Sequence, residues 1–203
     1  MKNNIIVIGA GGHAKVCIDL IKSSTNFRIK HVIGLQKESG KKILGIKIIG
    51  NKKDFKELLK TSRHAIIAFG QIKSYKKRKE YFTKLKKYGF KIPIIISKNA
   101  ILSKYSTVDE GTVVMNGSVI NANVNIGKNC IINSRSLIEH DCKIGDNVHV
   151  STGAIINGGV KIGSGTFVGS GAIVIQNIKI GENCIVGAGA IVKKNLKSNQ
   201  TIK

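Results

Sequence analysis

Aliphatic side chains recur at every sixth position through the second half of the chain. Sixteen consecutive positions of this series, from Leu102 to Val192, hold Ile, Val or Leu without exception. These three residue types make up 59 of the 203 residues, so a random order would place only about five of them in the series. The positions are Leu102, Val108, Val114, Ile120, Ile126, Ile132, Ile138, Ile144, Val150, Ile156, Ile162, Val168, Val174, Ile180, Val186 and Val192.

A repeat of six matches neither the α-helix, with about 3.6 residues per turn, nor by itself the two-residue alternation of a strand. It is typical of a chain wound into a three-sided coil with one short strand on each side, the hexapeptide-repeat parallel β-helix. Three repeats make one turn, so the series predicts a little over five turns.

The first half of the chain alternates between short apolar runs and segments with helical spacing. We expect strands at residues 5–8, 31–34, 43–49, 65–69 and 92–96, and helices at 14–22, 51–62 and 74–88. Strands separated by helices favour a parallel sheet with Rossmann-like topology. The sequence therefore predicts two domains, an α/β Rossmann-like domain at residues 1–96 and a β-helix at residues 97–203.

Glycines and cysteines occupy regular places in the repeat. Three cysteines lie two residues before a repeat aliphatic, a slot filled elsewhere by Ser, Ala, Thr or Val, and we expect small buried side chains there. The four cysteines, Cys17, Cys130, Cys142 and Cys184, show no metal-binding spacing, which favours structural thiols. Six glycines directly follow a repeat aliphatic, and we expect corners whose conformation a Cβ resists: Gly127, Gly145, Gly163, Gly169, Gly181 and Gly187.

The net charge is +23, with 34 Lys plus Arg against 11 Asp plus Glu. Such a charge is compatible with nucleic-acid binding. However, only four basic residues are Arg, the residue that suits phosphate and base recognition best, and the lysines are spread along the chain. We therefore expect no nucleic-acid partner, although the positive field would attract small anions. The apolar runs are too short for a membrane span or a signal peptide, so we expect a cytoplasmic protein without a membrane partner.

The segment from Ile138 to His149 holds the candidates for catalysis. His140 lies two positions after a repeat Ile, so its side chain should point outward, and Asp141 follows it directly. A carboxylate beside an imidazole fixes its tautomer and raises its basicity, as a general base requires. His149 lies nine residues further, half a turn away, so one chain cannot easily bring the two imidazoles together. Taken alone, an exposed histidine near an acid is more often a solvated surface group.

Two strings resemble the sugar O-/N-acyltransferases of the sialic acid O-acetyltransferase (NeuD) and PglD type. The first runs from Ile8 to Val16 (IGAGGHAKV), and the second runs from Ile138 to Cys142 (IEHDC). Residues 145–150 (GDNVHV) and 187–190 (GAGA) support them. The resemblance covers nearly the whole chain and implies a left-handed hand for the β-helix.

The resemblance also implies roles for particular residues. His140 would be the general base, with its basicity raised by Asp141. Acetyl-coenzyme A would be the co-substrate, with no metal, and its groove would lie between subunits of a homotrimer. The groove would be lined by His149, Gly158, Ser170 and Ala188.

The glycine loop at residues 9–13 follows an expected strand and opens an expected helix, so its backbone N–H groups can receive a phosphate. A dinucleotide-binding enzyme would also show an acidic residue near the end of the second strand. That region reads GLQKE at 34–38, without the Asp-Asp pair common in the family, which argues against NAD. We expect a sugar or sugar-nucleotide site formed by Gly11, Gly12, His13 and Gly70.

Two further departures from the family bear on the donor. Ser97 and Lys98 stand where the family often has His-Pro. The sequence ends at Lys203 without the Gly-x-Pro-Ala-Lys tail that commonly covers the adenine end of coenzyme A. We expect either weaker coenzyme A binding or a truncated sequence.

The resemblance implies acetyl transfer to an amino or hydroxyl group of a bacterial surface-glycan sugar, with a nucleotide-linked 4-amino sugar as the first expectation. Sialic acid O-acetylation is the alternative. A zinc carbonic anhydrase on the same scaffold would need three ligands, often histidines, and the repeat region has only His140 and His149. A third class is a basic scaffold for polyanions, which would bind in a salt-dependent manner.

Overall fold

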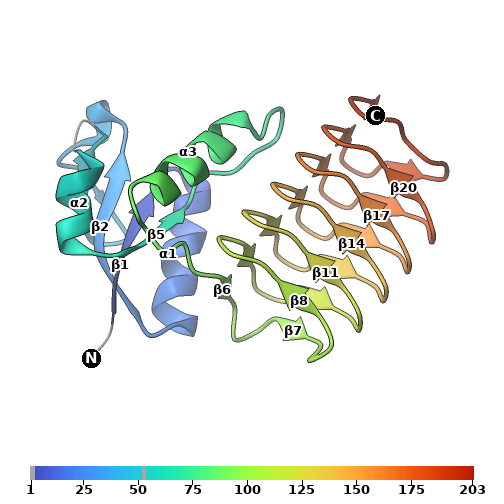
Figure 1. Ribbon diagram of the computed structural model, residues 1–203, viewed down its shortest axis with the longest axis horizontal. Helices are drawn as coiled ribbons and strands as arrows, with labels where there is room; N and C mark the ends of the chain where they lie inside the picture. The colour runs from blue at the N-terminus through green and yellow to red at the C-terminus, as the bar shows by residue number, and fades with distance from the viewer. Residues whose placement is uncertain (1–2, 52–53) are drawn as a thin grey trace.

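The computed structural model describes residues 3–51 and 54–203 of the chain. An α/β domain at the N-terminal end is followed by a prism of stacked coils, and the C-terminus lies at the far end of the prism (Figure 1). The fold is the one the sequence predicts, an α/β domain joined to a hexapeptide β-helix of the left-handed type.

The N-terminal sheet has five strands in the order β3-β4-β2-β1-β5. The strands are β1 (Asn3–Ile8), β2 (Phe27–Gly34), β3 (Lys42–Ile43), β4 (Ile46–Gly50) and β5 (His64–Ile67). Strands β4, β2, β1 and β5 are parallel, as the alternation of strands and helices predicts. The segment expected as one strand at 43–49 is instead an antiparallel hairpin of β3 and β4. It turns at Leu44 and Gly45, which both have positive φ.

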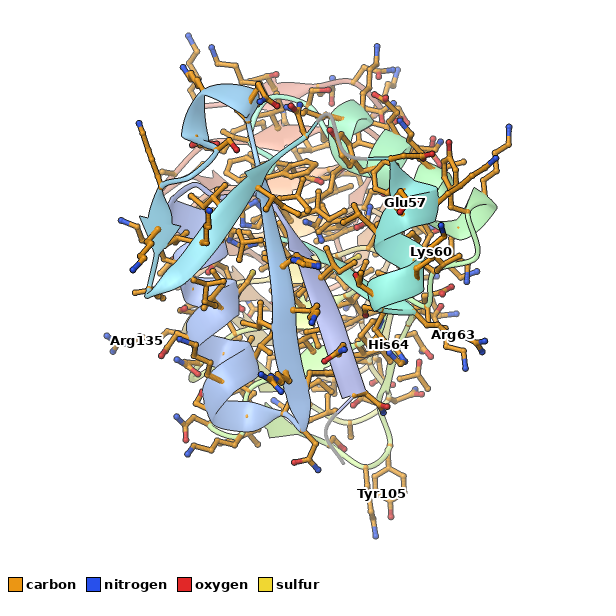
Figure 2. The ribbon with its side chains drawn as sticks, turned by 90° about the vertical axis from the view of Figure 1, so that its left-hand side faces the viewer. Glu57, Lys60, Arg63, His64, Tyr105 and Arg135 are labelled. Carbon is orange, nitrogen blue, oxygen red and sulfur yellow. The ribbon has the colours of Figure 1, made fainter. Side chains whose placement is uncertain are left out.

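Helices cover both faces of this sheet, with α1 and α2 on opposite sides of the strands (Figure 2). The helices are α1 (Gly12–Ser24), α2 (Phe55–Thr61) and α3 (Lys76–Lys87), with a short 3-10 turn η1 (Gln36–Glu38). Ile5 and Val7 of β1 pack with α1, whereas the alternate residues Ile6 and Ile8 pack with α2 and α3. Helix α2 begins later than expected, because Asp54 caps it by accepting a hydrogen bond from the Lys56 N–H. Residues 52 and 53 of that expected helix lie outside the described residues.

The prism has three sheets of two-residue strands, and every strand pairs in parallel with the strand one coil away. We name the sheets by what their outward faces carry. The domain-facing sheet contains β6 (Ile95–Ile96), β9 (Val113–Val114), β12 (Ile131–Ile132), β15 (His149–Val150), β18 (Phe167–Val168), β21 (Ile185–Val186) and β23 (Thr201–Ile202). The apolar sheet contains β7 (Ile101–Leu102), β10 (Val119–Ile120), β13 (Leu137–Ile138), β16 (Ile155–Ile156), β19 (Ile173–Val174) and β22 (Ile191–Val192). The lysine sheet contains β8 (Thr107–Val108), β11 (Asn125–Ile126), β14 (Lys143–Ile144), β17 (Lys161–Ile162) and β20 (Lys179–Ile180).

The sixteen repeat aliphatics form the core of the prism. Each is the second residue of its strand, and fourteen of them, from Val114 to Val192, are buried. Val108 is half-buried and Leu102 is 37 % exposed, because they lie in the first coil, which has no coil beneath it. Strand β6, expected to close the N-terminal unit, pairs instead with β9 of the prism.

The repeat glycines were expected at corners whose backbone conformation a Cβ resists, and this explanation is wrong. The six glycines that follow a repeat aliphatic do not have positive φ. Five of them are needed because a Cβ there would lie less than 3 Å from backbone of the next coil, as at Gly163, where the Glu182 N would be 2.6 Å away. The corners with a left-handed backbone conformation lie two residues after these glycine positions. They hold Gly or Asn, except at Arg135 and Asp141.

The cysteine interpretation is confirmed. All four cysteines are free and buried. The Sγ atoms of Cys130, Cys142 and Cys184 each donate to a carbonyl oxygen of the following coil, at 3.1–3.2 Å. Burial raises the pKa of Cys130 to about 12 and that of Cys142 to about 11, so neither thiol is poised as a nucleophile.

Two glycine substitutions should distinguish the glycines packed against backbone of the next coil from those at the left-handed corners. Gly163→Ala places a Cβ against backbone and should destabilise the protein by about 2 kcal/mol or more. Gly189→Asn should be nearly neutral, because Gly189 has φ +70° and open space, and Asn already occupies the equivalent corners at Asn177 and Asn183. Thermal unfolding of both variants measures the difference, and equal losses would contradict this division.

Candidate active site

The first residue of each short strand points out of the prism, and the three sheets differ in what they present. On the domain-facing sheet, Ile95 and Val113 are buried in the core formed by α1 and β1. On the apolar sheet every outward residue is aliphatic: Ile101, Val119, Leu137, Ile155, Ile173 and Ile191. On the lysine sheet the outward residues are Thr107, Asn125, Lys143, Lys161 and Lys179. One face is thus covered by the N-terminal domain, one is polar, and one is an aliphatic surface.

His140 and Asp141 lie at the corner between β13 and β14, where the apolar sheet meets the lysine sheet. The His140 Nδ1 is 2.8 Å from the Asp141 Oδ2, and the two side chains are 63 % and 56 % exposed. The other carboxylate oxygen accepts a hydrogen bond from the Asn123 Nδ2 one coil below, at 2.6 Å. The hydrogen bond from His140, with that from Asn123, lowers the pKa of Asp141, so the carboxylate is ionised at neutral pH.

This arrangement selects one tautomer of His140. Because an ionised carboxylate only accepts hydrogen bonds, Nδ1 carries the proton, and in the neutral ring the lone pair is then on Nε2. The ring lies over Gly158 of the next coil, where a Cβ would be 2.7 Å from Nε2. The missing side chain therefore leaves room for an outward-pointing, proton-accepting imidazole.

His140 opens onto a groove of about 550 Å³ that follows this corner from coil to coil. Its lining residues are Glu139, His140, Asp141, Asn157, Gly158, Gly159, Gln176 and Asn177. The corner of the next coil above Gln176 contains Lys193 and Lys194, which are both exposed. The His140–Asp141 pair and the two lysines therefore lie along the same corner of the prism.

The other residues expected in the donor groove lie elsewhere on the single chain. Ser170 and Ala188 occupy the corner between the domain-facing sheet and the apolar sheet, and the Ser170 Oγ is 3.0 Å from the Ser151 Oγ. Gly158 and His140 lie at the opposite edge of the apolar sheet. One chain therefore does not bring these two pairs together.

His149 is 5 % exposed and lies between the N-terminal domain and the prism. Its Nδ1–H donates to the Gln71 carbonyl oxygen at 2.6 Å, and its Nε2 accepts from the Asn133 Nδ2 at 3.2 Å. Burial lowers its pKa to about 4, and the nearby Arg78 guanidinium contributes to this shift. His149 is therefore a neutral group that ties the loop after β5 to the domain-facing sheet, and in a single chain it does not line the groove at His140.

Arg78 of α3 also joins the two domains. It is 1 % exposed, and it donates to the carbonyl oxygens of Ile67 and Phe69 at 2.8 and 3.0 Å and to that of Asn129 in the prism at 3.3 Å. His13 lies beside this cluster, and burial, followed by Arg78 and then His149, lowers its pKa to about 3. His13 is thus directed toward the domain interface and is neutral.

A second pocket, of about 240 Å³, lies at the carboxyl ends of β1 and β2 in the N-terminal domain. Its lining residues are Ile8, Gly9, Ala10, Gly11, Ile33, Gly34, Leu35, Glu38, Asn51, Phe69, Lys77 and Tyr81. Of the four residues expected to bind sugar, the pocket includes Gly11. Gly12 and Gly70 have open space around them, and His13 points toward the prism cluster.

Sequence reasoning missed Glu38, Lys77 and Tyr81 as pocket residues. Lys77 and Tyr81 are four residues apart on α3, so they share one face of the helix. The sequence does not indicate that this face contacts the pocket at the glycine loop. The Lys77 Nζ lies 5.5 Å from the centre of the Phe69 ring, which holds the cation at the pocket.

Neither a metal centre nor a membrane helix is found in the described part of the chain. Within residues 3–51 and 54–203, no three His, Cys, Asp or Glu side chains are grouped so that they could hold a metal ion. No helix in the same residues is long and apolar enough to cross a membrane.

A hexapeptide prism with an exposed His-Asp dyad beside a glycine-lined groove defines a class, the β-helical acyltransferases. Family comparison identifies a PglD N-terminal domain at residues 4–85 and bacterial transferase hexapeptide repeats at residues 123–158 and 159–194. The chain therefore combines the N-terminal domain of PglD with the hexapeptide repeats of bacterial transferases. A comparison with curated proteins gave no match.

Solved structures agree with this assignment over the full chain. PerB, the GDP-perosamine N-acetyltransferase of Caulobacter crescentus in complex with CoA and GDP-perosamine, is 29 % identical with a TM-score of 0.91, over 99 % of this chain and 94 % of that one. The acetyltransferase domain of PglB from Neisseria gonorrhoeae in complex with acetyl coenzyme A is 27 % identical with a TM-score of 0.87, over 99 % and 96 %. WeeI from Acinetobacter baumannii is 26 % identical with a TM-score of 0.82, over 98 % and 96 %. Structures of the Caulobacter enzyme also include variants with one histidine replaced by asparagine or alanine.

The buried His149 should make the protein acid-sensitive. The pKa of His149 is about 4 in the folded protein, below the usual 6.5. The contribution of the neutral ring to the free energy of unfolding is therefore complete above pH 6.5 and is lost as the pH falls toward 4. Between pH 7 and about 4.5 the native protein should lose about 2 kcal/mol more stability than His149→Gln. Urea unfolding at both pH values measures this difference. Parallel pH profiles for the two proteins would show that His149 titrates normally in the fold.

Proposed function

We propose that this chain is an acetyl-CoA-dependent N-acetyltransferase that acts on the amino group of a nucleotide-linked sugar. The observation that carries the proposal is the His140–Asp141 dyad, with a free Nε2 at a glycine-lined groove. The match to a GDP-perosamine N-acetyltransferase with CoA supports amine acetylation over the sialic acid O-acetylation that the family also contains.

The proton steps follow from the tautomer. The acceptor amine attacks the thioester carbonyl carbon while His140 Nε2 removes a proton from the nitrogen. The tetrahedral intermediate then collapses, the C–S bond breaks, and the coenzyme A thiolate takes that proton from Nε2. The acetyl group passes directly to the amine, in agreement with the raised thiol pKa of the neighbouring Cys142.

Asp141 acts on this reaction through His140. Its Oδ2 accepts the Nδ1–H and stabilises the imidazolium that forms during attack. The hydrogen bond from Asn123 to its other oxygen holds the carboxylate in place. The left-handed backbone at Asp141, with φ 60°, directs the side chain back toward His140.

The corner groove suits the acetyl donor in shape and charge. Gly158 and Gly159 leave the groove floor without side chains, so a thin thioester arm can approach the backbone. Lys193 and Lys194 lie three coils above His140, about 14 Å at the usual strand spacing, which is comparable with the reach of a pantetheine arm. Lys161 and Lys179 flank the same corner. These cations would offset the negative phosphates of coenzyme A.

The apolar sheet supports a homotrimer as the active form. A column of six outward aliphatic residues is unlike the other two faces, and Ile101 and Ile191 are 65 % and 51 % exposed in the single chain. The two predicted halves of the donor site, His140 with Gly158 and Ser170 with Ala188, lie at opposite edges of this sheet. Packing of second copies onto it would bring one edge of each chain against the other edge of its neighbour.

The N-terminal pocket would hold the nucleotide of the acceptor. The N-terminus of α1 at Gly11 and Gly12 offers free backbone N–H groups to a phosphate, and Lys77 adds a cation. This pocket and the His140 groove share no lining residue. We infer that the sugar bound by one chain reaches the His140 of a neighbouring chain.

Replacement of the base should affect turnover more than binding. His140→Ala should lower kcat by about 10²–10⁴-fold, because proton removal is lost. Gly158→Ala should lower kcat as well, because its Cβ would displace the imidazole from 2.7 Å away. Thiol release from acetyl-CoA with UDP-, GDP- and dTDP-4-amino sugars measures both variants. Glu57→Gln, on the outer surface of α2, serves as the control (Figure 2). Normal turnover in His140→Ala would remove this residue from the mechanism.

A charge on the apolar sheet should dissociate the oligomer. Ile155→Lys places a cation at the centre of the aliphatic column and should yield monomers that are folded but have at most a few per cent of native activity. Thr107→Lys, which places the same charge on the outward face of the lysine sheet and away from the groove, is the matched control. Light scattering with size-exclusion chromatography measures the mass. A native protein that is itself monomeric and active would refute the shared site.

A further inference from the structure

The carboxylate that the second strand lacks in the sequence is supplied by the turn that follows it. Glu38 belongs to η1, and its Oε2 accepts a hydrogen bond from the Leu35 N–H at 2.6 Å. This bond folds the side chain back over the end of β2. A Cβ on Gly34 would be 2.8 Å from that oxygen and 3.0 Å from the Cβ of Ala10. Glu38 therefore presents its carboxylate beside the glycine loop, at the carboxyl end of β2.

The second oxygen of Glu38 has no partner within the described chain. The ion pairs found in residues 3–51 and 54–203 join Lys60 with Glu57, Lys86 with Glu110 and His140 with Asp141. The hydrogen bonds of Glu38 use only Oε2 and leave Oε1 free. The residue is half-buried and lines the N-terminal pocket. In a chain with a net charge of +23, a carboxylate without a cation at a pocket wall is an acceptor available to a ligand.

The neighbouring groups define what kind of donor reaches Oε1. The first turn of α1 and Lys77 form an anion site at one end of the pocket, which suits a diphosphate. In nucleotide-binding α/β sheets, an acidic residue at the end of the second strand accepts a hydrogen bond from the ribose 2′-hydroxyl next to that phosphate site. Glu38 occupies this place although it comes from a 3-10 turn and not from the strand.

We propose that the Glu38 Oε1 accepts a hydrogen bond from the 2′-hydroxyl of the acceptor nucleotide, so that this enzyme selects sugars carried by ribonucleoside diphosphates over those carried by 2′-deoxyribonucleoside diphosphates. The proposal rests on the proposed function, since it assumes a nucleotide-linked acceptor. It narrows the acceptor from all nucleotide sugars to those linked to ribonucleoside diphosphates, which include the UDP- and GDP-linked classes, and disfavours the dTDP-linked class.

Binding of matched nucleotide pairs tests this selection. Isothermal titration calorimetry would compare UDP with 2′-deoxy-UDP and GDP with 2′-deoxy-GDP, on native protein, Glu38→Gln and the surface control Glu57→Gln. For the base that the pocket accepts, native protein and the control should bind the ribonucleotide about 10- to 100-fold more tightly than its deoxy counterpart. In Glu38→Gln the ratio should fall to about threefold or less, because the charge-assisted acceptor at this position is replaced by a neutral amide donor, whose hydrogen bond to the 2′-oxygen is weaker. The amide oxygen of Gln can still accept from the Leu35 N–H, so the turn should be retained.

Three outcomes would overturn the proposal. They are equal affinity of native protein for both members of each pair, an unchanged ratio in Glu38→Gln, and no binding of any of the four nucleotides. If Glu38→Gln does not fold, the ratio measured on native protein still decides the matter. Failure here is distinguishable from failure of the proposed function, because thiol release with an amino sugar and its loss in His140→Ala do not depend on the 2′-hydroxyl.

Discussion

Coil-on-coil stacking of the repeat aliphatics is the constraint on which the rest of this structure depends. Each strand is two residues long, and each pairs in parallel with the strand eighteen residues away through most of the prism, for example Leu137 with Ile155 and Ile138 with Ile156. Because side chains alternate along a strand, a buried second residue forces the first residue outward. The same stacking requires glycine after several of the aliphatics, where adjacent coils come too close for a Cβ.

This register turns one repeat into three surfaces with different uses. The domain-facing sheet buries its outward residues against the α/β domain, and Arg78 and His149 hold that junction through hydrogen bonds to carbonyl oxygens. The lysine sheet is polar. The apolar sheet lies between the corner with His140 and the corner with Ser170. A chain of this kind therefore has the proposed base, the proposed acceptor pocket and the proposed second wall of the donor groove in three separate places, and the proposed symmetric assembly would join them.

Much of this could be predicted from the sequence, because the repeat reports directly on burial. The β-helix, the buried cysteines and the outward direction of His140 beside Asp141 all follow from position within the six-residue period. The burial of His149 could not be predicted from the repeat. His149 is the outward residue of β15, but that sheet is covered by another domain, which a local repeat does not reveal.

The acceptor pocket could be predicted only in outline. The glycine loop was visible in the sequence, whereas Glu38 comes from η1 and Lys77 and Tyr81 come from α3, two segments that meet at the loop only after folding. Glu38 was present in the sequence at the right place, but its direction depends on a 3-10 turn and on the absence of a side chain at Gly34. Similarly, the hairpin of β3 and β4 was hidden in a continuous apolar run, since Leu44 gives no sign of its positive φ.

We infer that the acceptor pocket of one chain works with the His140 of another, and mixing of subunits tests this arrangement. Gly11→Trp fills the pocket while His140 stays intact, and His140→Ala leaves the pocket intact. Each variant alone should be inactive. Thiol release should return when the two variants are unfolded and refolded together into mixed oligomers. Mixed oligomers, verified by native mass spectrometry, that remain inactive would contradict it and place the whole site within one chain.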